Sequence, residues 1–162
     1  MQNAKDSFYV AVRNRLAVLN PVRVTEVRAV QRPGVLVEEA EAPARELPND
    51  VFVFRWTGVA AVQNLSSPLM SMRCEVHYAT SGSQMNTGLD RGRALAEMDR
   101  ELLRILKPLC TPKLRYTVTS AVTMQTIVFW TEPELAALET QRNQLLRVAT
   151  VTVFAFEEPG EA

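Results

Sequence analysis

The pattern of apolar and polar residues predicts a β-strand followed by an amphipathic helix in the middle of the chain. Over residues 69–78 every second side chain is apolar, which is the period of a half-buried strand. A loop rich in Ser, Gly and Asn follows, and residues 89–106 then carry apolar side chains at helical spacing. Thr87 is a candidate cap at the start of this helix, and Pro108 predicts its end.

A second helix is predicted near the start of the chain, over residues 3–19. Asp6 is a candidate N-cap. The apolar residues that recur at helical spacing are Phe8, Val12, Leu16 and Leu19. Asn20-Pro21 predicts the end of the helix, because a residue that precedes proline is disfavoured in the α region.

The remaining apolar stretches predict strands. Residues 22–30 and 35–40 flank the turn signal Gln31-Arg32-Pro33-Gly34 and predict a hairpin. Residues 51–62 predict a strand with apolar residues on both sides, which favours burial on both faces or contact with a partner. The other predicted elements are an exposed loop at 41–50, a turn at 63–68, an irregular or extended segment after Pro108, strands at 121–130 and 147–156, and an acidic frayed tail at 157–162.

These elements predict a single domain over residues 1–162. We expect an α+β fold, with a mostly antiparallel sheet of five to six strands and two long helices packed on one face. Residues 132–146 contain leucines at helical spacing and neither Gly nor Pro after Pro133, so either a short helix or a long extended arm is compatible with them.

Composition excludes some classes of function. The 18 basic and 18 acidic residues cancel, whereas a dedicated nucleic-acid-binding domain normally has a basic excess. Two cysteines are too few for a disulfide framework, and Cys74 is expected to be a small core residue. The chain shows no secretory signal and no apolar run near the ~20 residues that span a bilayer. We therefore expect a soluble protein that is made in the cytoplasm.

No pattern of residues indicates catalysis, a metal or a cofactor. His77 is the only histidine, and no nucleophile or second ligand is identified near it. Ser81-Gly82-Ser83 precedes a helix and could bind an anion, but such a segment is more often a simple connection. The acidic pairs Glu38-Glu39 and Glu157-Glu158 are expected to be solvated. We therefore expect no enzyme activity, no metal and no cofactor.

Three features favour a subunit of an assembly: the strand 51–62, the charged segment 132–146, and the arginine-bearing surface of the helix 89–106. Fifteen of the 18 basic residues are Arg, which is enriched at protein interfaces, although a GC-rich genome explains the same bias. Each of the three features also has an ordinary structural explanation, as a buried strand, a surface helix and a solvated helix face.

The order of the elements resembles the tail-terminator proteins of long-tailed bacteriophages and the cap subunits of contractile injection systems. The resemblance is carried by the helix DSFYVAVRNRLAVL, by MRCEVHYATSG leading to RGRALAEMDRELLRIL, and by the strand pair AVTMQTIVFW and RVATVTVFAF. It covers most of the chain as a pattern, without a diagnostic motif. The segment before the last strand is longer and more helix-like than in that family.

The resemblance implies a homo-oligomeric ring, commonly a hexamer, that ends a tail tube or sheath. Its partners would be the tube or sheath protein and a neck or cap protein, with no membrane and no sequence-specific nucleic acid. The particle would be assembled in the bacterial cytoplasm and the protein would be part of a virion tail or injection particle. The candidate subunit-interface residues are Arg32, Arg100, Arg104, Glu139 and Arg142. No catalytic residue carries over from the family.

Two other functions are compatible with the sequence. A head–tail connector or tube subunit of the same particle would have a similar fold and would form stacked rings or filaments. A small-molecule-binding or enzymatic α+β domain would be a monomer or dimer with a polar pocket, and the near absence of histidine disfavours it.

Overall fold

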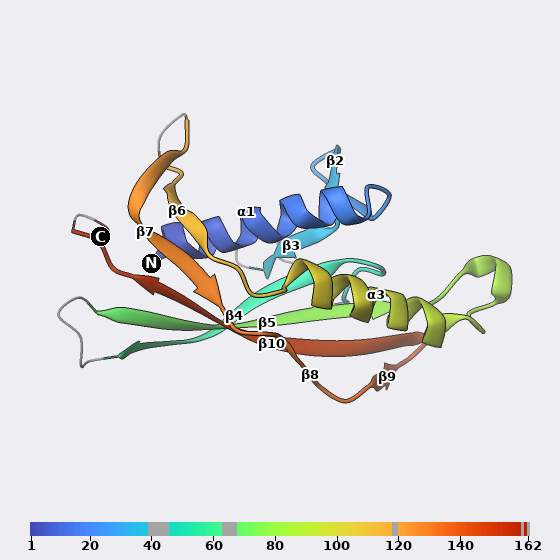
Figure 1. Cartoon of the computed structure of the whole chain (residues 1–162). Helices are drawn as coiled ribbons and strands as arrows, with labels where there is room; N and C mark the ends of the chain where they lie inside the picture. The colour runs from blue at the N-terminus through green and yellow to red at the C-terminus, as the bar shows by residue number, and fades with distance from the viewer. Residues whose placement is uncertain (39–45, 63–67, 118–119, 160, 162) are drawn as a thin grey trace.

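The fold is dominated by one long, curled β-sheet (Figure 1). The computed structural model describes all residues except 39–45, 63–67, 118–119, 160 and 162. Parts of the predicted loop 41–50 and turn 63–68 therefore lie outside the described residues. The elements are α1 (Gln2–Leu19), β1 (Val24–Val27), β2 (Val30–Pro33), β3 (Val35–Val37), β4 (Phe52–Val62), β5 (Leu69–Thr80), η1 (Gln84–Asn86), α3 (Arg91–Ile105), β6 (Thr111–Arg115), β7 (Val122–Trp130), β8 (Glu134–Leu135), β9 (Glu139–Gln141) and β10 (Gln144–Phe156).

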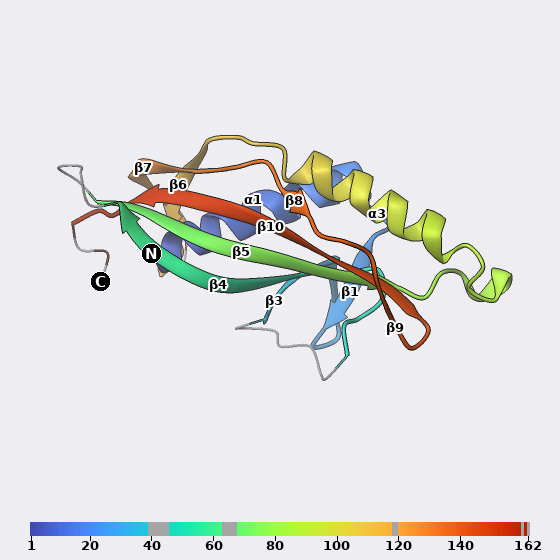
Figure 2. The ribbon, with the colours of Figure 1, turned by 90° about the horizontal axis from the view of Figure 1, so that it is seen from below.

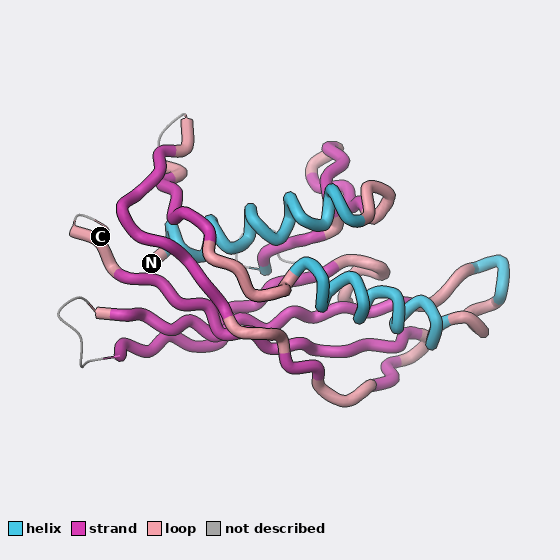
Figure 3. Tube along the Cα trace, viewed as in Figure 1, coloured by secondary structure: helices cyan, strands magenta, loops and turns pink. Residues whose placement is uncertain are grey.

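The predicted fold, a sheet of five to six strands with two long helices packed on one face, is wrong. The main sheet has eight strands in the order β3-β4-β5-β10-β7-β6, with β8 and β9 also paired to β10, and β1 and β2 form a separate pair. More residues lie in strands than in helices (Figure 3). The β6–β7 pair leaves the plane of the sheet and curls up beside α1 as part of a half-barrel (Figure 1).

The length of β10 explains this shape. Its 13 residues pair with β5 along nearly the whole strand on one side. On the other side β8 and β9 pair with residues 144–150, and β7 pairs only with residues 153–155. Seen from below, β4, β5 and β10 run side by side and form the long central part of the sheet (Figure 2). Because β7 joins β10 over three residues only, it is free to bend away from the sheet.

The predicted hairpin over residues 22–40 is also wrong. The turn lies at Arg28-Ala29, which both have positive φ angles (52° and 62°), and it joins β1 to β2 in antiparallel register. Two consecutive residues with positive φ form the tight hairpin turn whose twist suits paired strands. Pro33-Gly34 is not a turn, because the chain continues into β3, which pairs in parallel with β4.

Several predicted elements are confirmed. Helices α1 and α3 and strands β4, β5, β7 and β10 form where the apolar pattern places them. The predicted caps are wrong, since Met1 and Asp90 occupy the N-cap positions and Thr87 has a φ of 51° in the preceding loop. Segment 132–146 is neither helix nor free arm, because it forms β8, β9 and the start of β10.

The core lies between the helices and the sheet. Phe8 is fully buried and its ring lies within 6 Å of three other aromatic rings, those of Phe54, Trp56 and Trp130. The predicted stripe of α3 is confirmed as buried: Leu95, Met98, Leu102, Ile105 and Leu106. Cys74 is buried, as predicted. Leu19 departs from the predicted stripe of α1, because its side chain is exposed.

A buried lysine binds Glu158 and Glu161, so the predicted frayed tail is wrong for these residues, while 160 and 162 lie outside the described residues. Lys113 in β6 has a fully buried side chain. Its Nζ donates to Glu161 Oε2 at 2.6 Å and to the Phe156 carbonyl at 2.6 Å, and lies 3.5 Å from Glu158 Oε1. Glu158 also accepts hydrogen bonds from Thr126, so it is not the solvated carboxylate that the sequence predicted.

Candidate assembly interface

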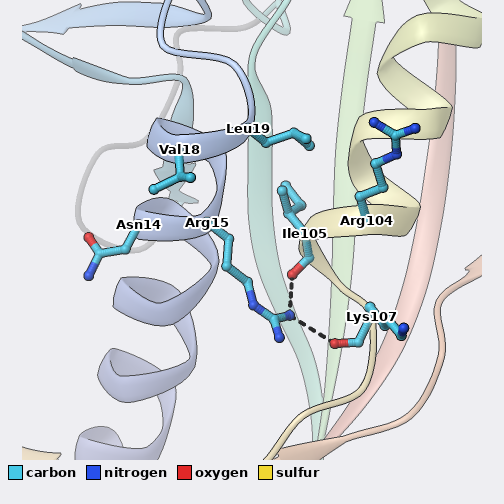
Figure 4. Close-up of a pocket in the computed structure, with 7 residues that line it drawn as sticks. All are labelled: Asn14, Arg15, Val18, Leu19, Arg104, Ile105 and Lys107. Atoms are coloured by element: carbon cyan, nitrogen blue, oxygen red, sulfur yellow. Dashed lines mark hydrogen bonds between the residues drawn. The ribbon is translucent and has the colours of Figure 1, made fainter.

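An open groove lies between the C-terminal ends of α1 and α3 (Figure 4). Its volume is about 630 Å³ and its lining is mostly apolar. The lining residues are Asn14, Arg15, Val18, Leu19, Arg104, Ile105 and Lys107. Val18 is 84% exposed although it lies on a long helix. A side chain of this kind gains about 1.5–3 kcal/mol when it is buried, so the groove favours an apolar occupant.

Arg15 holds the two walls of the groove together. Its Nη1 donates to the carbonyls of Ile105 at 2.7 Å and of Lys107 at 2.8 Å, as Figure 4 shows. Carbonyls at the end of a helix have no partner inside the helix, so this arginine satisfies them from α1. The guanidinium also lies 5.4 Å from the ring centroid of Trp130. The spacing of the two helix ends that form the groove is therefore fixed by contacts of Arg15 within the chain.

The loop between β5 and α3 forms an exposed apolar tip, which we define by Met85 and Leu89. Met85 is 95% exposed and Leu89 is 88% exposed. The loop projects beyond the end of the sheet, at the right of Figure 1. These two large apolar side chains, four positions apart in one loop, are candidates for contact with another surface.

The tip is a structured loop. Asp90 Oδ1 accepts the backbone N–H of Ser83 at 2.8 Å, and this hydrogen bond lowers the pKa of the Asp90 carboxyl. Gly82 has a φ of +72°, and a Cβ there would lie 2.7 Å from Asp90 Oδ1. A side chain at this position would clash with Asp90 and would strain the backbone, so the loop conformation requires glycine here.

The five residues predicted as interface lie in different parts of the molecule. Arg100 and Arg104 are exposed on α3, and Arg104 borders the groove. Arg32 lies in β2, beside a smaller hollow at the end of α1. Glu139 is exposed in β9, and Arg142 follows it in the turn to β10, where it pairs with Glu46. The structure therefore does not bring the five residues together into one surface.

The sequence reasoning missed the tip and the groove. A signal for the tip was present, since Met85 and Leu89 are the only large apolar residues in the polar loop 81–90. Val18 carried a weaker signal, because it lies off the apolar stripe of its helix. Neither signal shows that the two surfaces lie apart from each other, since that depends on the fold.

The described residues contain no group of three or more His, Cys, Asp or Glu side chains that could hold a metal ion. His77 Nε2 lies 3.0 Å from Glu75 Oε2 on the same strand, on the opposite side from the buried core residues of β5. Among the helices that the structure describes, none has the length and hydropathy needed to cross a membrane.

The comparisons with known proteins find similarity among solved structures. No family model matches the chain, and no curated protein matches it. The chain is similar to a chain of the virion of a native gene transfer agent particle, with a TM-score of 0.41 and 11% identity over 96% of this chain and 98% of that chain. A TM-score at this level is too low to establish a common fold or function.

Proposed function

We propose that this protein is a structural subunit of a phage-like particle, and that it forms a ring that ends the tail as a terminator or cap. The observation that carries the proposal is the presence of an exposed apolar tip and an open apolar groove on separate parts of one chain. The resemblance of the sequence to the tail-terminator family points the same way. This role requires no catalytic residue.

The tip and the groove match each other chemically. Met85 and Leu89 expose apolar side chains, and the groove exposes those of Val18 and Leu19. We propose that the tip of one copy enters the groove of the next. The two contacting surfaces then differ, which makes the contact heterologous, and a heterologous contact closes into a ring when its rotation permits.

The ring leaves other surfaces available for the rest of the particle. The β1–β2 hairpin with Arg32 lies outside the proposed tip and groove, and it remains a candidate for contact with tube, sheath, neck or cap proteins. Arg142 lines a hollow with Gly82 and Gly88 of the tip loop, so it remains a candidate for the contact between subunits. Arg100 lies on the exposed side of α3, whose C-terminal end forms one wall of the groove, so it remains a candidate subunit contact.

The proposal is tested by the mass of the purified protein in solution, measured by light scattering over a range of concentrations. We expect a discrete ring, either alone or on addition of a tail tube or sheath protein. Leu89→Lys in the tip and Val18→Lys in the groove should each abolish the ring, because each places an ammonium group in an apolar contact. Val122→Lys is the matched control, since Val122 is an exposed apolar residue in β7.

Mixing the two variants gives the sharper result. Leu89→Lys retains an intact groove and Val18→Lys an intact tip, so one good contact can form between them. The mixture should therefore contain pairs of twice the 18.1 kDa chain mass that neither variant forms alone by this contact. A mixture without pairs contradicts the head-to-tail contact. Open filaments in place of a closed ring favour the tube-subunit function over the terminator.

A further inference from the structure

The outer edge of β4 is a second and separate interaction surface. Strand β4 pairs with β5 on one side over its whole length, but β3 pairs with it on the other side only at residues 52–54. Residues 57–62 of β4 are all exposed, with Val59 at 48% and Val62 at 42%. In the described part of the chain, no strand pairs with the outer side of this segment.

The register shows which main-chain groups are open. Hydrogen-bonded and non-hydrogen-bonded pairs alternate along antiparallel strands. Phe52 donates its N–H to Gly34 on the β3 side, so its pair with Tyr78 of β5 is a non-hydrogen-bonded one. The same alternation continues past the bulge at Trp56/Gly58. The N–H and C=O groups of Val59 and Ala61 therefore point toward the open edge.

The other strand edges carry features that prevent pairing. The outer edge of β6 has Pro112, and the N–H of Leu114 is taken by Ser7 Oγ at 2.8 Å. On β7, the carboxylate of Glu158 accepts the N–H groups of Gln125 and Thr126. Proline and covering groups of this kind are the usual means by which proteins keep strand edges from associating.

The shorter strands are protected as well. Strands β8 and β9 have two and three residues and each has an exposed glutamate. Strand β3 has three residues, β1 carries Glu26, and β2 carries Arg32 and Pro33. By contrast, the segment Gly58–Val62 has no charge and no proline. Among the described residues it is therefore the one unprotected edge of more than three residues.

We propose that the β4 edge pairs with the same edge of a second copy of this chain, antiparallel about a two-fold axis at Ala60. A second copy fits this edge because the segment Gly58–Val62 carries no charge or proline and is complementary to itself in antiparallel register, and a second copy offers no other unprotected edge of this length among the described residues. In this register Val59 faces Ala61 of the second copy, Gly58 faces Val62, and Ala60 faces itself. Each valine lies opposite a small residue, and no like charges meet.

The open main-chain groups fit this register. Val59 and Ala61 are the residues whose N–H and C=O groups face outward, and the two-fold axis brings Val59 of each copy opposite Ala61 of the other. The contact therefore forms a closed set of strand hydrogen bonds and joins the two sheets into one. It is isologous and closes on itself, so it goes beyond the proposed ring and does not depend on it.

The contact is small. Stable interfaces bury about 800 Å² on each partner, and the edges of two five-residue segments bury less. The pairing is therefore a concentration-dependent dimerisation of the free protein. The dimer becomes stable where two copies are already held near each other.

The test uses the Leu89→Lys protein, in which the ring contact is removed, so that the two proposals fail separately. Sedimentation equilibrium should show a shift from 18.1 kDa toward twice that mass as the concentration rises. Adding Ala60→Lys should abolish the shift, because two ammonium groups then face each other across the axis, and Ala60→Glu should do the same. Mixing these two variants should restore the dimer, because opposite charges then face each other.

The control is Ser71→Lys, which adds the same charge on β5 next to Ala60 but away from the open edge. It should leave the dimer unchanged. The proposal is overturned by a protein that stays at 18.1 kDa at every concentration, by an Ala60→Lys protein that still dimerises, or by a mixture of the Lys and Glu variants that stays monomeric. Loss of the ring with retention of this dimer would contradict only the proposed function.

Discussion

Replacement of Lys113 by methionine should strongly destabilise the protein, because Lys113 is the one fully buried lysine that the structure describes. Its ammonium group is the shared partner of Glu158 and Glu161, whose side chains are only 11% and 4% exposed. Methionine keeps most of the length of the side chain and removes the charge. Glu158 then loses its cation in a place that water scarcely reaches, Glu161 keeps among the described residues only the N-terminal ammonium of Met1 at 3.2 Å, and the Phe156 carbonyl loses a donor.

The expected cost is about 3–5 kcal/mol, the usual effect of removing one partner of a buried ion pair. In a chain of this size, each kcal/mol lost from the free energy of unfolding lowers the midpoint of thermal unfolding by about 2–4 °C, so the midpoint should fall by roughly 10 °C. Urea unfolding followed by circular dichroism measures the free energy directly. Lys107→Met is the control, since Lys107 is exposed and the change in net charge is the same.

A second variant separates the charge from the packing. Adding Glu158→Gln to Lys113→Met removes the carboxylate that has no other cation among the described residues, and the amide oxygen can still accept from Thr126, so part of the lost stability should return. The reasoning is refuted if Lys113→Met unfolds within about 1 kcal/mol of the natural protein. It is also refuted if this double variant is less stable than Lys113→Met, because that would mean that the Glu158 carboxylate stabilises the fold without the lysine.

Three further predictions concern pH, the core and the helix surface. Desolvation raises the pKa of Glu158, but hydrogen bonds from Thr126 and Gln125 and the charge of Lys113 outweigh it and lower the pKa from 4.5 to about 2. The resulting stability is complete above pH 4.5 and is lost as the pH falls toward 2. The free energy of unfolding measured in urea should therefore decrease over this range, and it should decrease less in Glu158→Gln. Leu102→Ala should cost about 2–5 kcal/mol by the same measurement, since the side chain is fully buried, and unchanged thermal stability would contradict its place in the core. Reversal of charge at both Arg100 and Arg104 should weaken assembly more than folding, because both are exposed, and unchanged ring formation would exclude this face of α3 as an interface.

The long elements could be predicted because each is specified by its own residues. The stripe from Leu95 to Leu106 makes α3 amphipathic wherever it packs, and the alternation of β5 is a similar local signal. The same reasoning failed at residues 132–146, where Leu135 and Leu138 have helical spacing. In the fold, Leu135 lies opposite Ala149 of β10, so pairing with a long neighbouring strand overrides the local preference.

The buried lysine could not be predicted for a different reason. Lysine is almost always exposed, and the sequence around Lys113 gives no sign of its partners, which follow 45 and 48 positions later. Strand β6 contains Pro112, a residue that usually argues against a strand and is tolerated here because β6 lies at an edge of the sheet. Both features depend on which segments the fold brings together.

Strand β4 shows how one sequence pattern leads to two results. Apolar residues on both sides of residues 51–62 predicted either burial on both faces or contact with a partner. In the fold, the first part of the strand is buried and residues 57–62 are exposed. Phe52, Val53 and Phe54 are buried on both faces, where β3 covers the edge. Beyond the bulge at Trp56/Gly58 the same kind of pattern continues, paired with β5 on one side and with no described strand on the other. An open apolar strand edge is a template for pairing, but its sequence does not say whether a partner belongs to the same chain. The exposed half of β4 is therefore the segment to which we assign the proposed contact between chains.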